Sequence, residues 1–165
     1  MPIPQTLTSG TFPDLDLELV SGQWPVDLTG ELLISAPQPA DELEYCLFGF
    51  GSLLRISLRP GTHGAPTDRF ALRSQVLDTP SKAVHDRVPH AFRSTTFGFT
   101  SPLGFPNMSN TAPLPWGERL FTTWDVGRPV EVDPITLEVL GEVGARSDWG
   151  PPSLPMGEVL PFYFS

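Results

Sequence analysis

Three histidines, His63, His85 and His90, are the residues of this sequence best suited to holding a transition metal. Neutral imidazole is a common ligand for iron, zinc and copper. His85 and His90 lie five residues apart in SKAVHDRVPHAF, whereas two ligands on one helical face need an i, i+4 spacing. His63 lies in RPGTHGAPTD, which reads as a hairpin loop. We therefore expect each of the three histidines to be solvated or locally hydrogen-bonded.

Thiol and nucleotide chemistry also lack support in the sequence. The single cysteine, Cys46, excludes an internal disulfide and a cysteine-based zinc site. Its surroundings, EYCLFGF, are apolar and favour a buried structural thiol. The sequence contains no GxxxxGK[ST], GxGxxG, CxxC or GxSxG pattern. Nucleotide-binding, thiol-redox and serine-hydrolase functions are therefore not indicated.

The charge balance excludes another class of partner. The net charge is −9 and the pI about 4.6, and phosphate backbones repel such a surface, so we expect no nucleic-acid partner. No stretch approaches the roughly 18 apolar residues of a transmembrane helix. The beginning, MPIPQTLTSG, has neither the basic nor the apolar region of a secretory signal. The sequence thus predicts a cytoplasmic protein without a transmembrane segment, and leaves room for peripheral contact with a membrane.

Strand patterns dominate the chain. Its 20 prolines and 15 glycines interrupt nearly every window long enough for a helix, and only Asp68–Leu77 and Ser81–Val88 keep a short helical periodicity. Short apolar runs separated by turns predict an all-β fold of the sandwich, barrel or propeller type. The expected strands are Glu31–Ser35, Gly51–Leu58, Arg119–Trp124, Arg128–Val132, Thr136–Val143 and Val159–Ser165.

Local patterns add detail to three of these segments. Within GSLLRISL, alternation places Leu54, Ile56 and Leu58 on one face, and Arg55 and Ser57 on the other. In EVDPITLEV, an aspartate and a proline suit the first two positions of a type I turn, which predicts a tight antiparallel hairpin. The proline-rich segments PLPWGE and WGPPSLPMGE are expected to be exposed loops.

A longer pattern extends over three segments in order, VSGQWPVDLTGELLISAPQPA, LFGFGSLLRISLRPG and NMSNTAPLPWGERLFTTWDVGRPVEVDPITLEVLGEVG. Between Leu17 and Val143 they resemble the N-terminal part of the carotenoid oxygenases, also called carotenoid cleavage dioxygenases. The third is the most specific: Asn-Thr, a Gly-x-Arg-Leu strand, an acid with Gly-x-Pro, and Asp-Pro-x-Thr-Leu-x-x-x-Gly. The matching positions are Gly22, Pro25, Leu28, Gly30, Pro37, Pro39, Asn110, Thr111, Gly117, Arg119, Leu120, Asp125, Gly127, Pro129, Asp133, Pro134, Thr136, Leu137 and Gly141.

Two positions depart from the family's pattern. Phe48 and Phe50 stand where an Asp-Gly-Asp-Gly turn has its aspartates, which bears on loop geometry more than on chemistry. The acid of the third segment is usually glutamate, and here it is Asp125, one methylene shorter.

The resemblance implies a seven-bladed β-propeller with a ferrous ion on its axis, held by four histidines from different blades. Three glutamates behind them hydrogen-bond some of the imidazoles, which fixes their tautomer and raises their basicity. The implied substrates of the full-length protein are O₂ and an apolar polyene or aromatic alkene, which is cleaved at a double bond into two carbonyl products. Asp125 takes the place of one such acid; the alternative is a solvated turn aspartate in WDVG.

The resemblance also implies that residues 1–165 are the N-terminal part of a single propeller domain. A blade takes about 40–45 residues in propellers with known repeats, so this chain cannot close a ring of seven. The family's first ligand histidine comes in an Ala-His-Pro unit, which the sequence lacks. One alignment lays Ser153–Pro155 on that unit, with Leu154 in place of the histidine, as in a pseudoenzyme. The other makes residues 148–165 the loop and strand before the unit.

We favour the second alignment and expect a truncated dioxygenase, inactive and without bound iron as this chain alone. The competing hypothesis is a catalytically inactive β-propeller-type binding module or pseudoenzyme that lacks the iron site. Four tryptophans, Trp24, Trp116, Trp124 and Trp149, are its candidate contact anchors.

Overall fold

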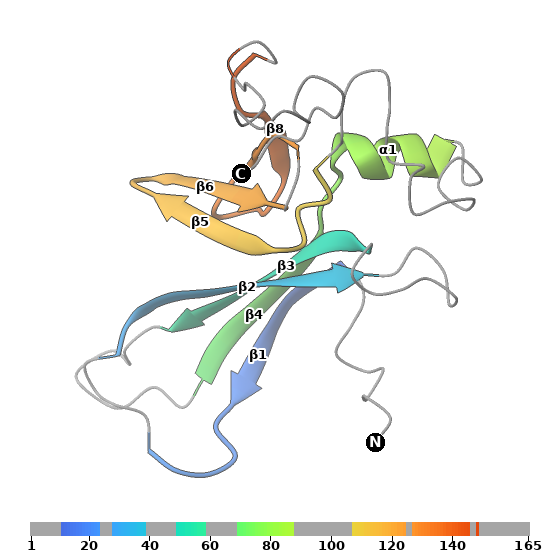
Figure 1. The fold of residues 1–165 in the computed structure, drawn as a ribbon. Helices are drawn as coiled ribbons and strands as arrows, with labels where there is room; N and C mark the ends of the chain where they lie inside the picture. The colour runs from blue at the N-terminus through green and yellow to red at the C-terminus, as the bar shows by residue number, and fades with distance from the viewer. Residues whose placement is uncertain are drawn as a thin grey trace.

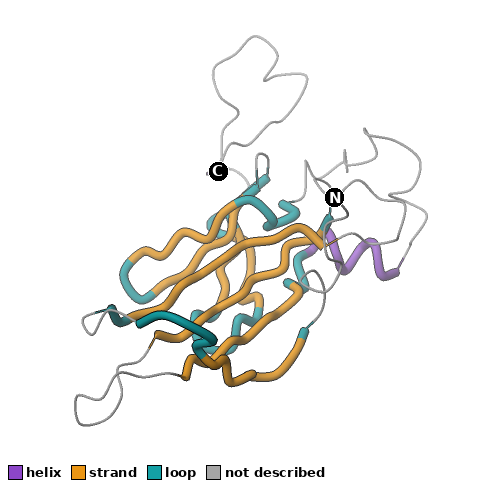
Figure 2. Tube along the Cα trace, turned by 90° about the horizontal axis from the view of Figure 1, so that it is seen from below, coloured by secondary structure: helices purple, strands orange, loops and turns teal. Residues whose placement is uncertain are grey.

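The computed structural model describes residues 11–23, 28–38, 49–58, 69–87, 107–124, 127–145 and 148. Within these ranges the chain forms eight strands and one helix (Figure 1). The strands make two antiparallel four-stranded sheets, and the helix lies beside them at one end (Figure 2). The expectation of a mainly β fold is confirmed for this part of the chain.

The first sheet has the strand order β1-β4-β3-β2. Its strands are β1 (Phe12–Glu18), β2 (Gly30–Gln38), β3 (Phe50–Leu58) and β4 (Arg69–Val76). Strands β2 and β3 pair without a break, from Gly30 opposite Leu58 to Gln38 opposite Phe50. The expected strands Glu31–Ser35 and Gly51–Leu58 are confirmed with longer bounds. Strand β1 was not expected, although FPDLDLE contains strand-like alternation.

The prediction of a short helix over Asp68–Leu77 is wrong, because this segment contains strand β4. Strand β4 is central: it pairs with β1 on one side and with β3 on the other. Its buried side chains, Phe70 and Ser74, lie on one face of the sheet, as a period of two requires. Pairing along both edges outweighed a helical periodicity that covered only a short window.

The helix expected over Ser81–Val88 is confirmed as α1 (Pro80–Arg87); Val88 itself lies outside the described residues. The hydroxyl oxygen of Thr79 accepts a hydrogen bond from the backbone N–H of Lys82 at 3.3 Å. Threonine at the N-cap followed by proline in the first turn is a favourable helix start. Both Thr79 and Ser81 are fully buried, so the beginning of α1 is anchored in the protein interior.

The second sheet has the order β5-β6-β7-β8, with β5 (Ala112–Trp116), β6 (Arg119–Thr123), β7 (Val130–Val132) and β8 (Val139–Glu142). The strands expected over Arg119–Trp124, Arg128–Val132 and Thr136–Val143 are therefore confirmed with shorter bounds. The prediction that PLPWGE is an exposed loop is wrong in part, because its first four residues belong to strand β5. This strand is at the edge of the sheet, where prolines are tolerated.

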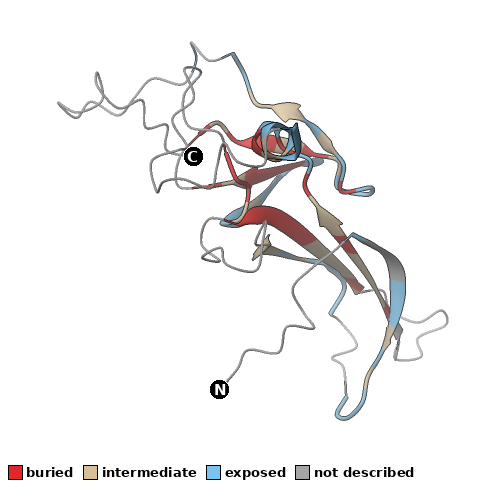
Figure 3. Ribbon diagram, turned by 90° about the vertical axis from the view of Figure 1, so that its right-hand side faces the viewer, coloured by how far each residue is buried: buried red, intermediate tan, exposed pale blue. Residues whose placement is uncertain are grey.

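The two sheets bury an apolar core between them (Figure 3). It consists of Leu53, Leu77, Leu120, Val130, Val132 and Leu137, each at most 1% exposed. The face assignment in β3 needs a correction: Leu53 is fully buried, whereas Leu54, Ile56 and Leu58 are half-buried. The side of β3 that carries Arg55 and Ser57 is the side that faces the second sheet.

The expected hairpin at Asp133 is confirmed, since β7 pairs with β8 in antiparallel register. One carboxylate oxygen of Asp133 accepts hydrogen bonds from the backbone N–H groups of Ile135 at 2.8 Å and Thr136 at 2.7 Å. These bonds lower the pKa of Asp133, the one to Thr136 having the largest effect. Leu137 closes the turn with a positive φ of 64°, and its side chain enters the core.

Arginines of the first sheet hold the turn of this hairpin. The Nη1 atom of Arg55 donates to the carbonyl oxygens of Pro134 at 2.7 Å and Ile135 at 2.8 Å. Arg73, directly opposite Arg55 across β3 and β4, donates to the Ile135 carbonyl at 3.1 Å. Because Arg55 also lies 3.7 Å from the carboxylate of Glu31, its charge is balanced while it joins the two sheets.

Replacement of Arg55 by lysine should destabilise the contact between the sheets. Lysine has a compact ammonium group on a flexible stem and does not reproduce the planar guanidinium that reaches both turn carbonyls. We expect a loss of about 1–2 kcal/mol in the free energy of unfolding, near the lower end of the range for hydrogen bonds to charged groups, because these bonds are exposed. Equilibrium urea denaturation measures it. Arg87→Lys, at the exposed end of α1, is the control and should change little; equal losses in both variants would contradict the role of Arg55.

The Asp133 turn should make the stability depend on pH. The pKa of Asp133 is lowered in the folded protein from a reference value of 3.8, so its ionised form favours folding above that value. This contribution should be lost as the pH falls through the lower, folded-state pKa. Asp133→Asn keeps the oxygen acceptor but cannot ionise. The advantage of the natural protein over this variant in thermal unfolding midpoint should therefore shrink between about pH 5 and pH 2; a difference that stays constant over that range would exclude the effect.

Candidate functional site

The structure describes only some of the candidate residues. Asp125, His63, His90 and Cys46 lie outside the described residues, as do Trp24, Trp149 and the strand expected over Val159–Ser165. His85 is described: it is half-buried on α1, and its ring meets the ring of Phe50 edge-on, with centroids 5.0 Å apart. His85 thus packs against an aromatic side chain of β3.

The described part of the chain contains no group of three or more histidine, cysteine, aspartate or glutamate side chains that could hold a metal ion. A four-histidine iron site therefore does not fit the residues that the structure describes. We assign no catalytic step to them. What they can do is position neighbouring segments, and the segment of most interest is the connection between β6 and β7, in which Asp125 lies.

Both ends of the β6–β7 connection are well defined. Trp124 follows β6 and is 8% exposed. Gly127 is buried and has a φ of 91°, a conformation that favours glycine. The connection therefore leaves and re-enters the sheet at buried positions.

Asn107, which is 2% exposed, contacts residues on both sides of this connection. Its side-chain Nδ2 donates to the carbonyl oxygen of Thr122 at 3.3 Å and to that of Arg128 at 2.7 Å. Its Oδ1 accepts from the backbone N–H of Ser109 at 2.5 Å and from the Ser109 hydroxyl at 3.2 Å. Its backbone carbonyl accepts from the Ser81 hydroxyl at 2.9 Å. One buried residue thus connects the second sheet with α1.

The segment Asn107–Asn110 also lies against the first sheet. The N–H of Gly51 donates to the Met108 carbonyl at 2.7 Å. A Cβ atom on Gly51 would lie 2.1 Å from the Ser109 carbonyl oxygen, so only glycine fits without a shift. Asn110 Nδ2 donates to the Gly49 carbonyl at 2.6 Å.

The same contacts explain the unusual turn sequence before β3. Gly49, like Gly51, is in close contact with backbone: a Cβ there would lie 2.5 Å from the carbonyl group of Gln38. Phe50, at a position where the family pattern has an aspartate, is buried and packs on His85. Glycine at positions 49 and 51 therefore avoids overlap with neighbouring backbone atoms. Phenylalanine at position 50, in place of the family's aspartate, fills an apolar site.

Sequence reasoning singled out Asn110 as part of the family pattern but missed Asn107 and Ser109. The available signal was the pair of asparagines in NMSN, directly before an expected strand. Buried asparagines need several partners, but both amide donors of Asn107 bond to backbone carbonyls that lie 15 and 21 residues away, which the sequence does not specify.

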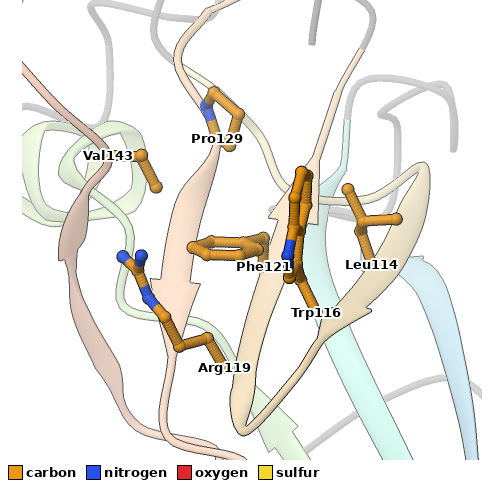
Figure 4. A pocket seen from close by; sticks show the side chains of 6 residues that line it. All are labelled: Leu114, Trp116, Arg119, Phe121, Pro129 and Val143. Carbon is orange, nitrogen blue, oxygen red and sulfur yellow. The ribbon is translucent and has the colours of Figure 1, made fainter.

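The other notable feature is an apolar recess on the far face of the second sheet, with a volume of about 410 Å³ (Figure 4). It is lined by Leu114, Trp116, Arg119, Phe121, Pro129 and Val143. Trp116 is 74% exposed, whereas Trp124, another candidate anchor, is buried.

Among the described residues that line the recess, the charged one, Arg119, is already paired. The guanidinium of Arg119 makes two hydrogen bonds of 2.7 Å to the carboxylate of Glu131 and lies 4.7 Å from the ring centre of Phe121. The pairing raises the pKa of Arg119 and lowers that of Glu131. The recess therefore presents apolar surface rather than a free cation. It suits an apolar contact better than an anionic ligand.

No helix within the described ranges has the length and apolar character needed to cross a membrane.

Comparisons with known proteins agree with the architecture. Residues 5–157 match the family described as retinal pigment epithelial membrane protein. A curated relative is carotenoid cleavage dioxygenase 7, chloroplastic, from Oryza sativa subsp. japonica, which is 34% identical over 105 residues. The match covers 58% of this chain and 16% of the rice protein.

Similar solved structures include variants of the apocarotenoid oxygenase from Synechocystis. In one, an aspartate replaces a glutamate; it has a TM-score of 0.65 and 23% identity, and the match covers 83% of this chain and 30% of that chain. A cobalt-substituted form of the same oxygenase has a TM-score of 0.62 and 23% identity, and the match covers 82% of this chain and 30% of that chain.

These likenesses confirm the fold class as part of a seven-bladed β-propeller. The chain spans 16% of the rice protein and 30% of the Synechocystis chains. Because the family match extends over most of the sequence, this chain belongs to the carotenoid oxygenases, the family of the retinal pigment epithelial membrane protein, and corresponds to their N-terminal portion.

Proposed function

We propose that this chain is the N-terminal part of a non-haem Fe(II) dioxygenase that cleaves a carbon–carbon double bond of a carotenoid, apocarotenoid or stilbene-like substrate. The observation that carries the proposal is the family match over residues 5–157. The names of the relatives support the substrate class, since they are a carotenoid cleavage dioxygenase and an apocarotenoid oxygenase. Residues 1–165 form one part of a single propeller domain in this proposal.

The iron of the proposed enzyme would be held by histidines supplied outside this chain. The chain's own contribution is structural: two sheets of the ring, and the connection that carries Asp125. In this proposal the carboxylate of Asp125 accepts a hydrogen bond from a ligand imidazole, and this chain alone neither binds iron tightly nor turns over.

The substrates of the complete protein would be O₂ and an apolar polyene or aromatic alkene, with two carbonyl compounds as products. A cytoplasmic location stays a prediction, and the rice relative is chloroplastic by name. Peripheral contact with a membrane also stays a prediction.

A specific observation favours the competing function, a binding module or pseudoenzyme. Trp116 is largely exposed at the rim of an apolar recess, and exposed tryptophans are frequent anchors of protein contacts. The natural coding sequence downstream of Ser165 separates the two proposals. An in-frame Ala-His-Pro shortly after this residue, followed by three further spaced histidines, is expected for the dioxygenase. A reading frame that ends without them would favour the binding module.

The role of Asp125 can be tested in the complete protein. Asp125→Asn removes the charge that would orient a ligand histidine, and should lower iron affinity or turnover by about 10- to 100-fold. Asp125→Glu restores the acid that is usual in the family and should retain both. Iron content after dialysis against a chelator and the rate of substrate bleaching are the measurements.

Asp16→Asn, an equal charge change on the exposed side of β1, is the control. Full iron retention and turnover in Asp125→Asn would reject the proposed role. If the natural complete protein neither retained iron nor turned over substrate, the proposed dioxygenase function would be rejected.

A further inference from the structure

We infer that the far face of the second sheet is an interface within the complete polypeptide, and that the β-sheet following β8 in the sequence packs on it. In this assignment an aliphatic or aromatic side chain of that sheet fills the apolar recess beside Trp116 and Phe121. The inference rests on the propeller fold and goes beyond the proposed function, because it requires neither iron nor turnover.

The second sheet is apolar on both of its faces. Val130 and Val132 belong to the face that is buried against the first sheet, and both are fully buried. On the opposite face Leu114 lies across from Phe121, and the apolar surface continues to the residues that flank β7 and β8. An antiparallel sheet with one solvated face carries mainly polar residues on that face. Apolar residues on both faces indicate a sheet with a neighbour on each side.

The rim of the recess is built on a tight hairpin. Trp116 lies directly opposite Arg119 across β5 and β6, with a two-residue turn between them. The first turn residue, Gly117, has a φ of 60°, and glycine at this position is typical of a type II′ turn. The exposed fractions of Trp116 and Leu114 are 74% and 48%. A short, well-defined hairpin therefore presents these two apolar side chains to the outside.

The charged groups on this face are compatible with an apolar cover. Arg119 donates two hydrogen bonds to the carboxylate of Glu131, and Figure 4 shows the ring of Phe121 between Arg119 and Trp116. A charge that is buried without a partner strongly destabilises a protein, whereas a paired one costs far less. Because this pair is formed within the sheet, the covering sheet does not have to supply a counter-charge.

The occupant of the recess follows from the way the sheets succeed one another. The first and second sheets are consecutive in the chain and bury their core between them. In repeat folds each unit buries its apolar face against its neighbours, and consecutive elements are usually adjacent in space. The chain leaves β8 at Val143, which itself lines the recess. The Synechocystis chains with this fold are covered over only 30% of their length, so the shared fold has further sheets to supply.

The shape of the recess favours a sheet over a small molecule. Its volume of about 410 Å³ would admit a small ligand, but ligand sites enclose most of the ligand surface. Here the tryptophan at the rim is largely exposed. Gly141 lies opposite Glu131 on the same face, and a Cβ atom on it would meet no atom within 4 Å. The recess is therefore broad and open, as a contact between two sheet faces requires.

The first test measures the solvent access of Trp116 in the protein expressed from the complete natural reading frame. Hydroxyl-radical labelling followed by mass spectrometry gives the oxidation rate of each tryptophan. Trp124, which is 8% exposed, is the internal reference for a buried ring. If a sheet covers the recess, Trp116 should be oxidised no more than about twice as fast as Trp124, because the centres of such contacts are packed like protein interiors. A larger ratio would overturn the inference.

Two further outcomes would assign the recess to another occupant and also overturn the inference. Protection of Trp116 that disappears on dilution, together with a change from dimer to monomer, would point to a second copy of the chain. Protection that appears only after addition of an apocarotenal would point to a small apolar ligand.

The second test compares two leucines on the edge strands of the second sheet. Leu114→Asp places a carboxylate in the recess, and Leu140→Asp places one on β8 at a position that is 62% exposed. Both positions are exposed in the described part of the chain, so that part alone predicts similar, small effects. Under a covering sheet, Leu114→Asp should lower the thermal unfolding midpoint of the complete protein by about 5 °C or more, and Leu140→Asp by much less.

Equal shifts in the two variants would contradict the inference. If Leu114→Asp does not fold, the labelling of the natural protein decides, since it needs no substitution. Both measurements are independent of iron. Protected Trp116 in a protein without iron or turnover would support the interface while the proposed dioxygenase is rejected. Full turnover with an exposed Trp116 would overturn the interface alone.

Discussion

A direct backbone contact between the segment Asn107–Asn110 and strand β3 determines how the two sheets meet. Gly51 and Ser109 approach so closely that a single methyl group would overlap with a carbonyl oxygen. Such proximity buries peptide groups, which must then be paired. The Met108 carbonyl is paired with the Gly51 N–H, and the Gly51 carbonyl with the Leu77 N–H. The side-chain amides of Asn107 and Asn110 bond to further carbonyls nearby.

This dense pairing gives the sheet junction a different character from the core beside it. Leucine and valine side chains supply burial between the sheets, but apolar packing is non-directional and tolerates repacking. Hydrogen bonds between buried peptide and amide groups have defined lengths and angles. The junction therefore sets the geometry, while the core supplies most of the apolar burial. The arginine pair at the Asp133 turn adds a second, more exposed point of attachment.

Features encoded by neighbouring residues were the ones that could be predicted from the sequence. The turn at Asp133 and Pro134 depends on the aspartate's own bonds to the next residues, and the start of α1 depends on Thr79 and Pro80. Strand β4 and the buried face of β3 could not be predicted, because each depends on which strands and which sheet lie against it. The proline-containing β5 was missed for the same reason. For the site, the family pattern indicated Asp125 and Asn110, but the role of Asn107 depends on carbonyls that only the folded chain brings together.

The turn residue Leu137 has a consequence for the order of folding. Its left-handed backbone conformation is unfavourable for a residue with a Cβ atom, yet its side chain is completely buried among residues of both sheets. The isolated β7–β8 hairpin would bear the backbone strain without the compensating burial. Its native turn should therefore be sparsely populated before the first sheet is present, which makes the docking of the two sheets and the closing of this hairpin a single cooperative event.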